Sequence, residues 1–93
     1  MPYQMMSPRL PLGRTYATSG ALALGVDLSA YLRRHQCGDW GEGLCDEDRQ
    51  ANEDALIQGT RLLSCYHTPA GDRLFIITEH DRSVTTALLP DEY

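Results

Sequence analysis

Side chains that can carry acid–base or ligand-binding chemistry are concentrated in two short segments of the sequence. An imidazole or a carboxylate can transfer protons there, and an arginine can anchor an anion through two parallel hydrogen bonds. The candidate binding residues are His35, Asp39, Trp40, Asp48 and Asn52 in the first segment, and Glu79, Asp81 and Arg82 in the second. If the fold brings the two segments together, they form one shallow site.

Each segment also has a structural interpretation. His35 falls on the apolar face of an expected helix, by i+3, i+4 and i+7 spacing, which predicts a half-buried histidine with one hydrogen bond. The Trp40 ring is expected to be buried in the core, where its indole N–H needs a hydrogen-bond acceptor. Glu79 and Asp81 flank Arg82 and would form an ion network that stabilises the turn, although such exposed pairs contribute little individually.

Two polar residues interrupt the apolar stripe of a third expected helix. Asp48 and Asn52 fall on or beside that stripe, by i+3 and i+4 steps. A buried carboxylate or amide without a hydrogen bond costs several kcal/mol. We therefore expect both side chains to bond the backbone of the glycine-rich loop 38–43 and to hold Trp40 in place.

The sequence favours neither a metal nor a cofactor site. Cys37, Cys45 and Cys65 do not follow the spacing of zinc ligands, and no Walker A loop, G-x-G-x-x-G or HExxH motif is present. Cys37 with His35 as its base is a weak nucleophile candidate, because the sequence implies no third group to orient the base. We expect no metal, no cofactor and no catalytic residue.

The elements that must position these side chains change period half-way along the chain. Helical spacing predicts helices over 19–24, 27–36 and 45–58, and alternating or β-branched runs predict strands over 13–18, 60–68, 73–79 and 84–89. The fold class expected is α+β, an antiparallel meander of three to four strands packed on one face by two or three short helices. We expect a poorly ordered lead-in over residues 1–11 and a single domain over 12–93.

Composition and charge limit the class of partner. The 93 residues carry a formal net charge of −5, which argues against binding nucleic acid directly through a broad basic surface. A protein partner is easier to accommodate, including one with a basic, nucleic-acid-binding surface. Three cysteines without a framework spacing fit a reducing cytoplasm, and no apolar run approaches the length of a membrane span.

From residue 12 onward the chain resembles a widespread family of small bacterial proteins. The family is frequent on plasmids and other mobile elements and is usually labelled hypothetical, plasmid-related or restriction endonuclease subunit M. In this sequence Gly43 is inserted between Glu42 and Leu44, where the family runs from the acidic residue directly to leucine. The residues that carry the resemblance are Leu12-Gly13, Ala17-Thr18, Gly20-Ala21-Leu22, His35, Gly38-Asp39-Trp40-Gly41, Asp48-Arg49, Ala51-Asn52, Phe75-Ile76-Ile77-Thr78-Glu79, Asp81-Arg82-Ser83, Thr85-Thr86 and Leu88-Leu89-Pro90.

The resemblance implies a setting rather than an activity. We therefore expect a small non-enzymatic interaction or inhibitor protein of mobile genetic elements. Its partner would be host nucleic-acid-processing or defence machinery, as for an anti-restriction or anti-CRISPR protein, and the acidic run 46–54 could face a basic surface. The alternative is a small enzyme or ligand-binding module that uses the His, Asp, Asn, Glu and Arg cluster. A third possibility is a structural accessory that works only as an oligomer.

Overall fold

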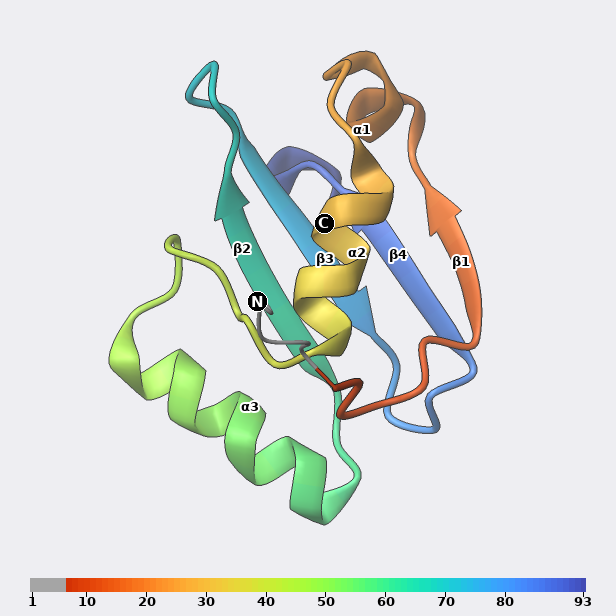
Figure 1. Ribbon diagram of the computed structural model, residues 1–93, viewed down its shortest axis with the longest axis vertical. Helices are drawn as coiled ribbons and strands as arrows, with labels where there is room; N and C mark the ends of the chain where they lie inside the picture. Colours follow the sequence, from red (N-terminus) through yellow and green to blue (C-terminus); the bar gives the residue numbers. More distant parts are fainter. Residues whose placement is uncertain (1–6) are drawn as a thin grey trace, which may run out of the picture.

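A four-stranded sheet organises the computed structural model, which describes residues 7–93. The strands are β1 (Arg14–Ala17), β2 (Leu62–His67), β3 (Arg73–Thr78) and β4 (Val84–Leu88), and they lie in the order β1-β4-β3-β2. β2, β3 and β4 form the predicted antiparallel meander, with β3 in the centre (Figure 1). The α+β class expected from the sequence is confirmed.

β1 departs from the meander because it pairs with β4 in the parallel direction. A tight turn between two strands forces them to run antiparallel, whereas a long connection leaves the direction free. The connection from β1 passes through all of the α-helices before the meander begins. The sheet is therefore mixed, and β1 is the edge strand on the β4 side.

The helices begin and end where local signals predict. They are α1 (Ser19–Ala23), α2 (Leu28–Gln36) and α3 (Asp46–Gln58), and the 3-10 turn η1 (Pro90–Glu92) follows β4. The Thr18 hydroxyl caps α1, the Asp27 carboxylate caps α2, and Gly59 ends α3 with a φ of 74°.

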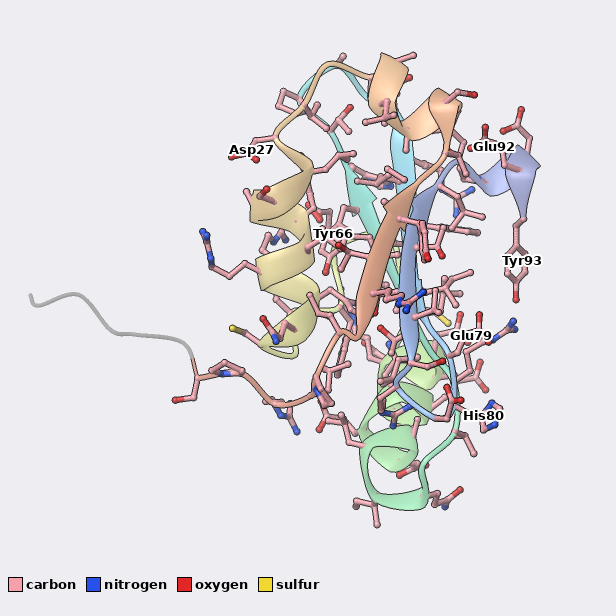
Figure 2. All side chains as sticks on the ribbon, turned by 90° about the vertical axis from the view of Figure 1, so that its right-hand side faces the viewer. Asp27, Tyr66, Glu79, His80, Glu92 and Tyr93 are labelled. Atoms are coloured by element: carbon pink, nitrogen blue, oxygen red, sulfur yellow. The ribbon has the colours of Figure 1, made fainter. Side chains whose placement is uncertain are left out.

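α2 covers one face of the sheet, and the opposite face carries no α-helix (Figure 2). The main core lies between α2 and the sheet and includes Tyr66, Leu74, Ile76 and Ala87. A second cluster lies near α3, where Leu10, Trp40, Ala55 and Leu62 pack together.

Residues 9 and 10 belong to the fold and are not part of a loose lead-in. The Arg9 amide donates to the Gln36 carbonyl at 2.8 Å, and Gln36 returns a hydrogen bond to the Leu10 carbonyl at 3.1 Å. The Arg9 guanidinium also pairs with Glu53 at 2.7 Å. Residues 1–6 of the segment 1–11 expected to be poorly ordered lie outside the described residues.

Candidate functional site

The loop around Trp40 lies along the outer edge of β2 as a substitute strand. The Cys65 amide donates to the Trp40 carbonyl at 3.0 Å, and the Gly43 amide donates to the Cys65 carbonyl at 2.9 Å. Gly41 between them has a φ of 92°, and a side chain there would collide with the Cys65 carbonyl. Gly43 is therefore one of the two residues that pair this loop with β2.

The Trp40 ring is buried, as predicted, with 3% of its surface exposed. Its indole N–H donates to the Glu53 carboxylate at 2.9 Å, and that carboxylate also binds Arg9. These hydrogen bonds, with that from Arg9 the largest, keep the pKa of Glu53 below its ordinary value. Arg49 adds a hydrogen bond to the Gly41 carbonyl, so that α3 holds both the ring and the backbone of the loop.

The hydrogen-bond partners expected for Asp48 and Asn52 are wrong. Asp48 is exposed, because the first turn of α3 lies in solvent, where its carboxylate also faces the positive end of the helix dipole. Asn52 is buried, but its amide bonds β2 instead of the glycine-rich loop. Its Nδ2 donates to the Leu63 carbonyl at 2.7 Å, and its Oδ1 accepts from the Leu63 amide at 3.1 Å.

Asp39 forms an ion pair that holds the start of the loop. The Arg34 Nε lies 2.6 Å from the Asp39 carboxylate, and the guanidinium stacks over the Tyr66 ring at 4.6 Å. Partial burial favours the protonated form of Asp39, but its hydrogen bond and ion pair with Arg34 outweigh it and lower the pKa. The Tyr66 hydroxyl donates to the Asp39 carbonyl at 2.6 Å, which ties the loop to the core.

His35 is fully buried and makes two hydrogen bonds, where the sequence predicted half-burial and one. Thr85 donates to the Leu12 carbonyl at 2.7 Å, so its oxygen accepts from the Thr78 hydroxyl at 2.7 Å. Thr78 then accepts from the His35 Nε2–H at 2.8 Å. The unprotonated Nδ1 is left to accept from the Ser64 hydroxyl at 2.6 Å. The network therefore fixes one neutral tautomer.

Burial, together with the charge of Arg82, lowers the pKa of His35 to about 4. The Arg82 guanidinium is itself surrounded by backbone carbonyls. It donates to Thr60 at 2.6 Å and Ala55 at 2.9 Å, and more weakly to Glu79 and His80. Arg82 thus fixes the end of α3 against the turn, although its φ of 62° is unusual for a residue other than glycine.

The ion network predicted for the second segment does not form. The Asp81 carboxylate accepts from the amide and hydroxyl of Ser83, and Arg82 bonds carbonyls instead of carboxylates. Glu79 is exposed on the sheet face opposite α2 (Figure 2). The second segment therefore supplies a turn and one exposed carboxylate.

The eight candidate residues do not converge on a cavity. His35 and Trp40 are in contact, with ring centroids 5.8 Å apart, and Arg82 acts on His35 through its charge. Both rings are buried, however, and the Arg82 guanidinium is taken up by carbonyls. A pocket of about 510 Å³ lies elsewhere, and none of the eight residues lines it. Its lining residues are Gly25, Val26, Asp27, Ala30, Tyr31, Arg34 and Pro69.

No family model, curated protein or solved structure matches this chain. Within residues 7–93, no helix is both long and apolar enough to cross a membrane. That part of the chain also holds no group of three His, Cys, Asp or Glu side chains arranged to bind a metal ion.

Three residues that hold the Trp40 loop were not among the site residues predicted from the sequence. Arg34, Arg49 and Glu53 are ordinary surface charges by pattern, yet each bonds the loop or its tryptophan. One signal was available: Glu53 follows Arg49 by four residues, so both side chains leave α3 on neighbouring positions of one face. The sequence did not indicate the hydroxyl partners of His35, because a hydroxyl on a strand is compatible with either face of the sheet. These partners are Ser64, Thr78 and, through Thr78, Thr85.

Proposed function

We propose that this protein is a small non-enzymatic interaction protein that inhibits a larger partner by docking on it. The observation that carries the proposal is the outward face of α3. Asp46, Glu47 and Asp54 are exposed there, and Asp48 is exposed in the first turn on the side of the helix that packs inward further along. None of the four forms an ion pair within residues 7–93. Ile57, on the same helix, has 86% of its surface exposed.

Unpaired carboxylates beside an exposed apolar side chain suit a partner that is basic at its rim and apolar at its centre. Charge complementarity steers such a complex together, and burial of the apolar anchor holds it. Glu47, Asp54 and Ile57 lie within the outward-facing half of α3 by helical spacing, so one partner surface can meet all three. A basic surface of this kind is typical of proteins that handle nucleic acid.

Hydrogen bonds fix α3 to the rest of the fold, which lowers the conformational entropy that docking would cost. Asn52 bonds the backbone of β2, Glu53 bonds Trp40 and Arg9, and Arg82 bonds the last turn. These bonds join α3 to the start of β2, to the Trp40 loop and to the turn between β3 and β4, at the lower end of the sheet in Figure 1. The acidic face is therefore presented in one orientation.

The resemblance to plasmid-borne bacterial proteins supplies the biological part of the proposal. A protein carried by mobile elements gains from blocking host restriction or CRISPR machinery, whose nucleic-acid-binding surfaces are basic. We accordingly propose host defence machinery as the class of partner. The mechanism is occlusion of that basic surface by α3, without chemistry.

The first prediction concerns capture of the partner. Tagged protein incubated with host lysate at low salt should retain a protein with a basic surface. The triple variant Glu47→Gln, Asp48→Asn and Asp54→Asn should retain it at least about tenfold less, because three charges of the interface are lost. Affinity purification with mass spectrometry measures the recovery. A shift to roughly 0.5 M salt should release the partner from the wild type.

A matched control removes the same charge from other surfaces. The variant Asp27→Asn, Asp72→Asn and Asp91→Asn also loses three carboxylates and should retain the partner as the wild type does. Asparagine at position 27 keeps the cap of α2, so this control should fold normally. Equal recovery by the two triple variants, or no recovery above the tag alone, would overturn the proposed function.

A further inference from the structure

The two edges of the sheet differ in how they are covered. Along the outer edge of β2, the Trp40 loop forms hydrogen bonds with Cys65. β1 forms the other edge, and within residues 7–93 it pairs with β4 alone. Figure 1 shows β1 as the outermost strand on its side of the molecule, and Figure 2, which looks onto that side, shows β1 in front. An open edge offers backbone donors and acceptors to another strand.

The open backbone groups of β1 belong to Thr15 and Ala17. The Arg14 and Thr18 amides donate to carbonyls of β4 and of the residue before it, at 2.9 and 3.0 Å. This parallel register turns every second residue toward β4. Thr15 and Ala17 therefore turn their N–H and C=O groups away from β4, and no residue within 7–93 bonds them.

An antiparallel copy of β1 fits this edge with Tyr16 at the two-fold axis. Thr15 of each copy then exchanges hydrogen bonds with Ala17 of the other, which uses the open groups of both. Tyr16 lies opposite its counterpart in a non-hydrogen-bonded pair, where side chains come closest and aromatic pairs stabilise a sheet. The Tyr16 side chain is available for this contact, because it is 53% exposed in the single chain.

The face of β1 that carries Tyr16 has a basic and an acidic end. Ala17 packs against the core under α2, so Tyr16 and Arg14 point to the opposite face of the sheet. Figure 2 shows Glu92 on that opposite side, beyond the C-terminal end of β1. Arg14 and Glu92 are exposed, and neither forms an ion pair within residues 7–93.

Glu92 is held where an antiparallel copy would bring an arginine. Its carboxylate accepts from the Thr18 hydroxyl at 2.6 Å and from the Leu89 amide at 2.8 Å. These hydrogen bonds, with that from Thr18 the largest, keep the pKa of Glu92 below its ordinary value, so the carboxylate is charged at neutral pH. With Tyr16 at the axis, Arg14 of each copy lies opposite Thr18 of the other, beside its Glu92. The edge is therefore complementary to itself in charge.

We propose that β1 pairs antiparallel with β1 of a second copy of this chain, forming a two-fold symmetric dimer with Tyr16 at the axis and an ion pair between Arg14 and Glu92 at each end. The interface is isologous, because both copies use the same surface. α3 flanks β2 at the far edge of each sheet, so the acidic helices lie away from the joined edge (Figure 1). The proposal does not depend on the function proposed for α3.

The mass and the amide exchange of the purified chain test this proposal. Sedimentation equilibrium from about 1 µM to about 500 µM should show a mass approaching twice the 10.4 kDa chain at the upper end. Over the same range, hydrogen exchange of the Thr15 and Ala17 amides, measured by nuclear magnetic resonance, should slow at least about tenfold. Amides in the first turn of α3 have no helical partner and should exchange at an unchanged rate.

Two variants weaken the joined edge in different ways. Thr15→Pro removes an open N–H and leaves the bonds to β4 in place, a position where proline is tolerated in a strand. Arg14→Glu places like charges together at both ends of the interface. Each should weaken dimerisation at least about tenfold. Arg33→Glu reverses another exposed arginine, on α2, and should dimerise as the wild type does.

Three outcomes would overturn the proposal. The first is a wild type that stays monomeric over the whole range, and the second is a dimer in which the Thr15 and Ala17 amides stay unprotected. The third is equal dimerisation by Arg14→Glu and Arg33→Glu. Circular dichroism checks that Thr15→Pro is folded. If it is not, Arg14→Glu decides the matter, because the side chain it replaces is exposed and unpaired within residues 7–93.

Discussion

At the scale of single residues, buried polar side chains join elements that the sheet's own ladder does not connect. The Asn52 amide gives α3 the same pair of hydrogen bonds to β2 that a neighbouring strand would give. His35 joins α2 to β2 and β3 through Ser64 and Thr78. Within residues 7–93 every buried side-chain nitrogen and oxygen has a partner. The loss of one of these groups therefore leaves other buried polar groups without a hydrogen-bond partner.

Replacing Asn52 tests this directly. Asn52→Ala removes both bonds to Leu63 and should lower the free energy of unfolding by about 2–3 kcal/mol, because two backbone groups lose their partner. Asp48→Ala, one turn earlier on α3, should change it by less than about 0.5 kcal/mol, since Asp48 is exposed. Urea denaturation followed by circular dichroism gives both values. A larger loss for Asp48→Ala would contradict the structure.

The buried imidazole makes stability depend on pH. The pKa of His35 is about 4 in the folded chain, below the ordinary value of 6.5 that the unfolded chain keeps. The unfolded chain therefore takes up a proton first as the pH falls. The contribution of this pKa difference to the free energy of unfolding is complete above pH 6.5. It is lost progressively as the pH falls towards 4. Between pH 7 and pH 5 the free energy of unfolding should drop by about 2 kcal/mol.

Urea denaturation at half-unit pH steps measures that drop. His67 and His80 are exposed, so the double variant His67→Gln and His80→Gln should keep the same pH dependence. Nuclear magnetic resonance should show the ring signals of His35 unchanged from pH 8 to pH 5. A His35 ring that titrates near pH 6.5 would contradict its burial.

Residue patterns predicted which side chains are buried better than they predicted which partners bind them. Helical spacing correctly placed Asn52 on a buried face, and Trp40 was correctly expected in the core as the anchor of its loop. Helical spacing also named Asp48 in place of Glu53 as a carboxylate that holds the tryptophan. That choice depends on the rotation of α3 against the edge of β2, which is set by contacts between segments far apart in the sequence.

At the scale of elements, the strands and helices follow local signals, whereas their arrangement does not. Caps at Thr18 and Asp27 and the stop at Gly59 could be read directly from the sequence. The parallel pairing of β1 with β4 could not, since no short connection links them. The pairing of the Trp40 loop with β2 could not be predicted for the same reason. Three glycines indicate a turn, whereas the hydrogen bonds of Trp40 and Gly43 go to Cys65, more than twenty residues away.

Two glycines with nearly equal φ allow the stability cost of local backbone strain to be distinguished from the cost of a collision with β2. Gly41 has a φ of 92° and Gly71 a φ of 91°, but only Gly41 lies against another strand. Gly71→Ala should cost about 1 kcal/mol, from backbone strain alone. Gly41→Ala should cost about 3 kcal/mol or more, because the new methyl group displaces the loop from Cys65. Thermal melting of the two variants compares them, and equal losses would mean that the loop is not pressed against β2.

At the scale of the whole molecule, α3 and the sheet face opposite α2 differ in what they expose. α3 offers exposed carboxylates and Ile57, whereas Cys65, Ile77 and Leu88 on that sheet face are buried.

The covering of the β2 edge has a further consequence for solubility. The Trp40–Gly43 loop and Asn52 occupy backbone groups that would otherwise template the addition of a foreign strand. A change that frees this loop would unmask a bare edge next to an apolar sheet face. Such variants should lose part of their soluble yield to inclusion bodies, and the fraction that stays soluble should show the lower stability.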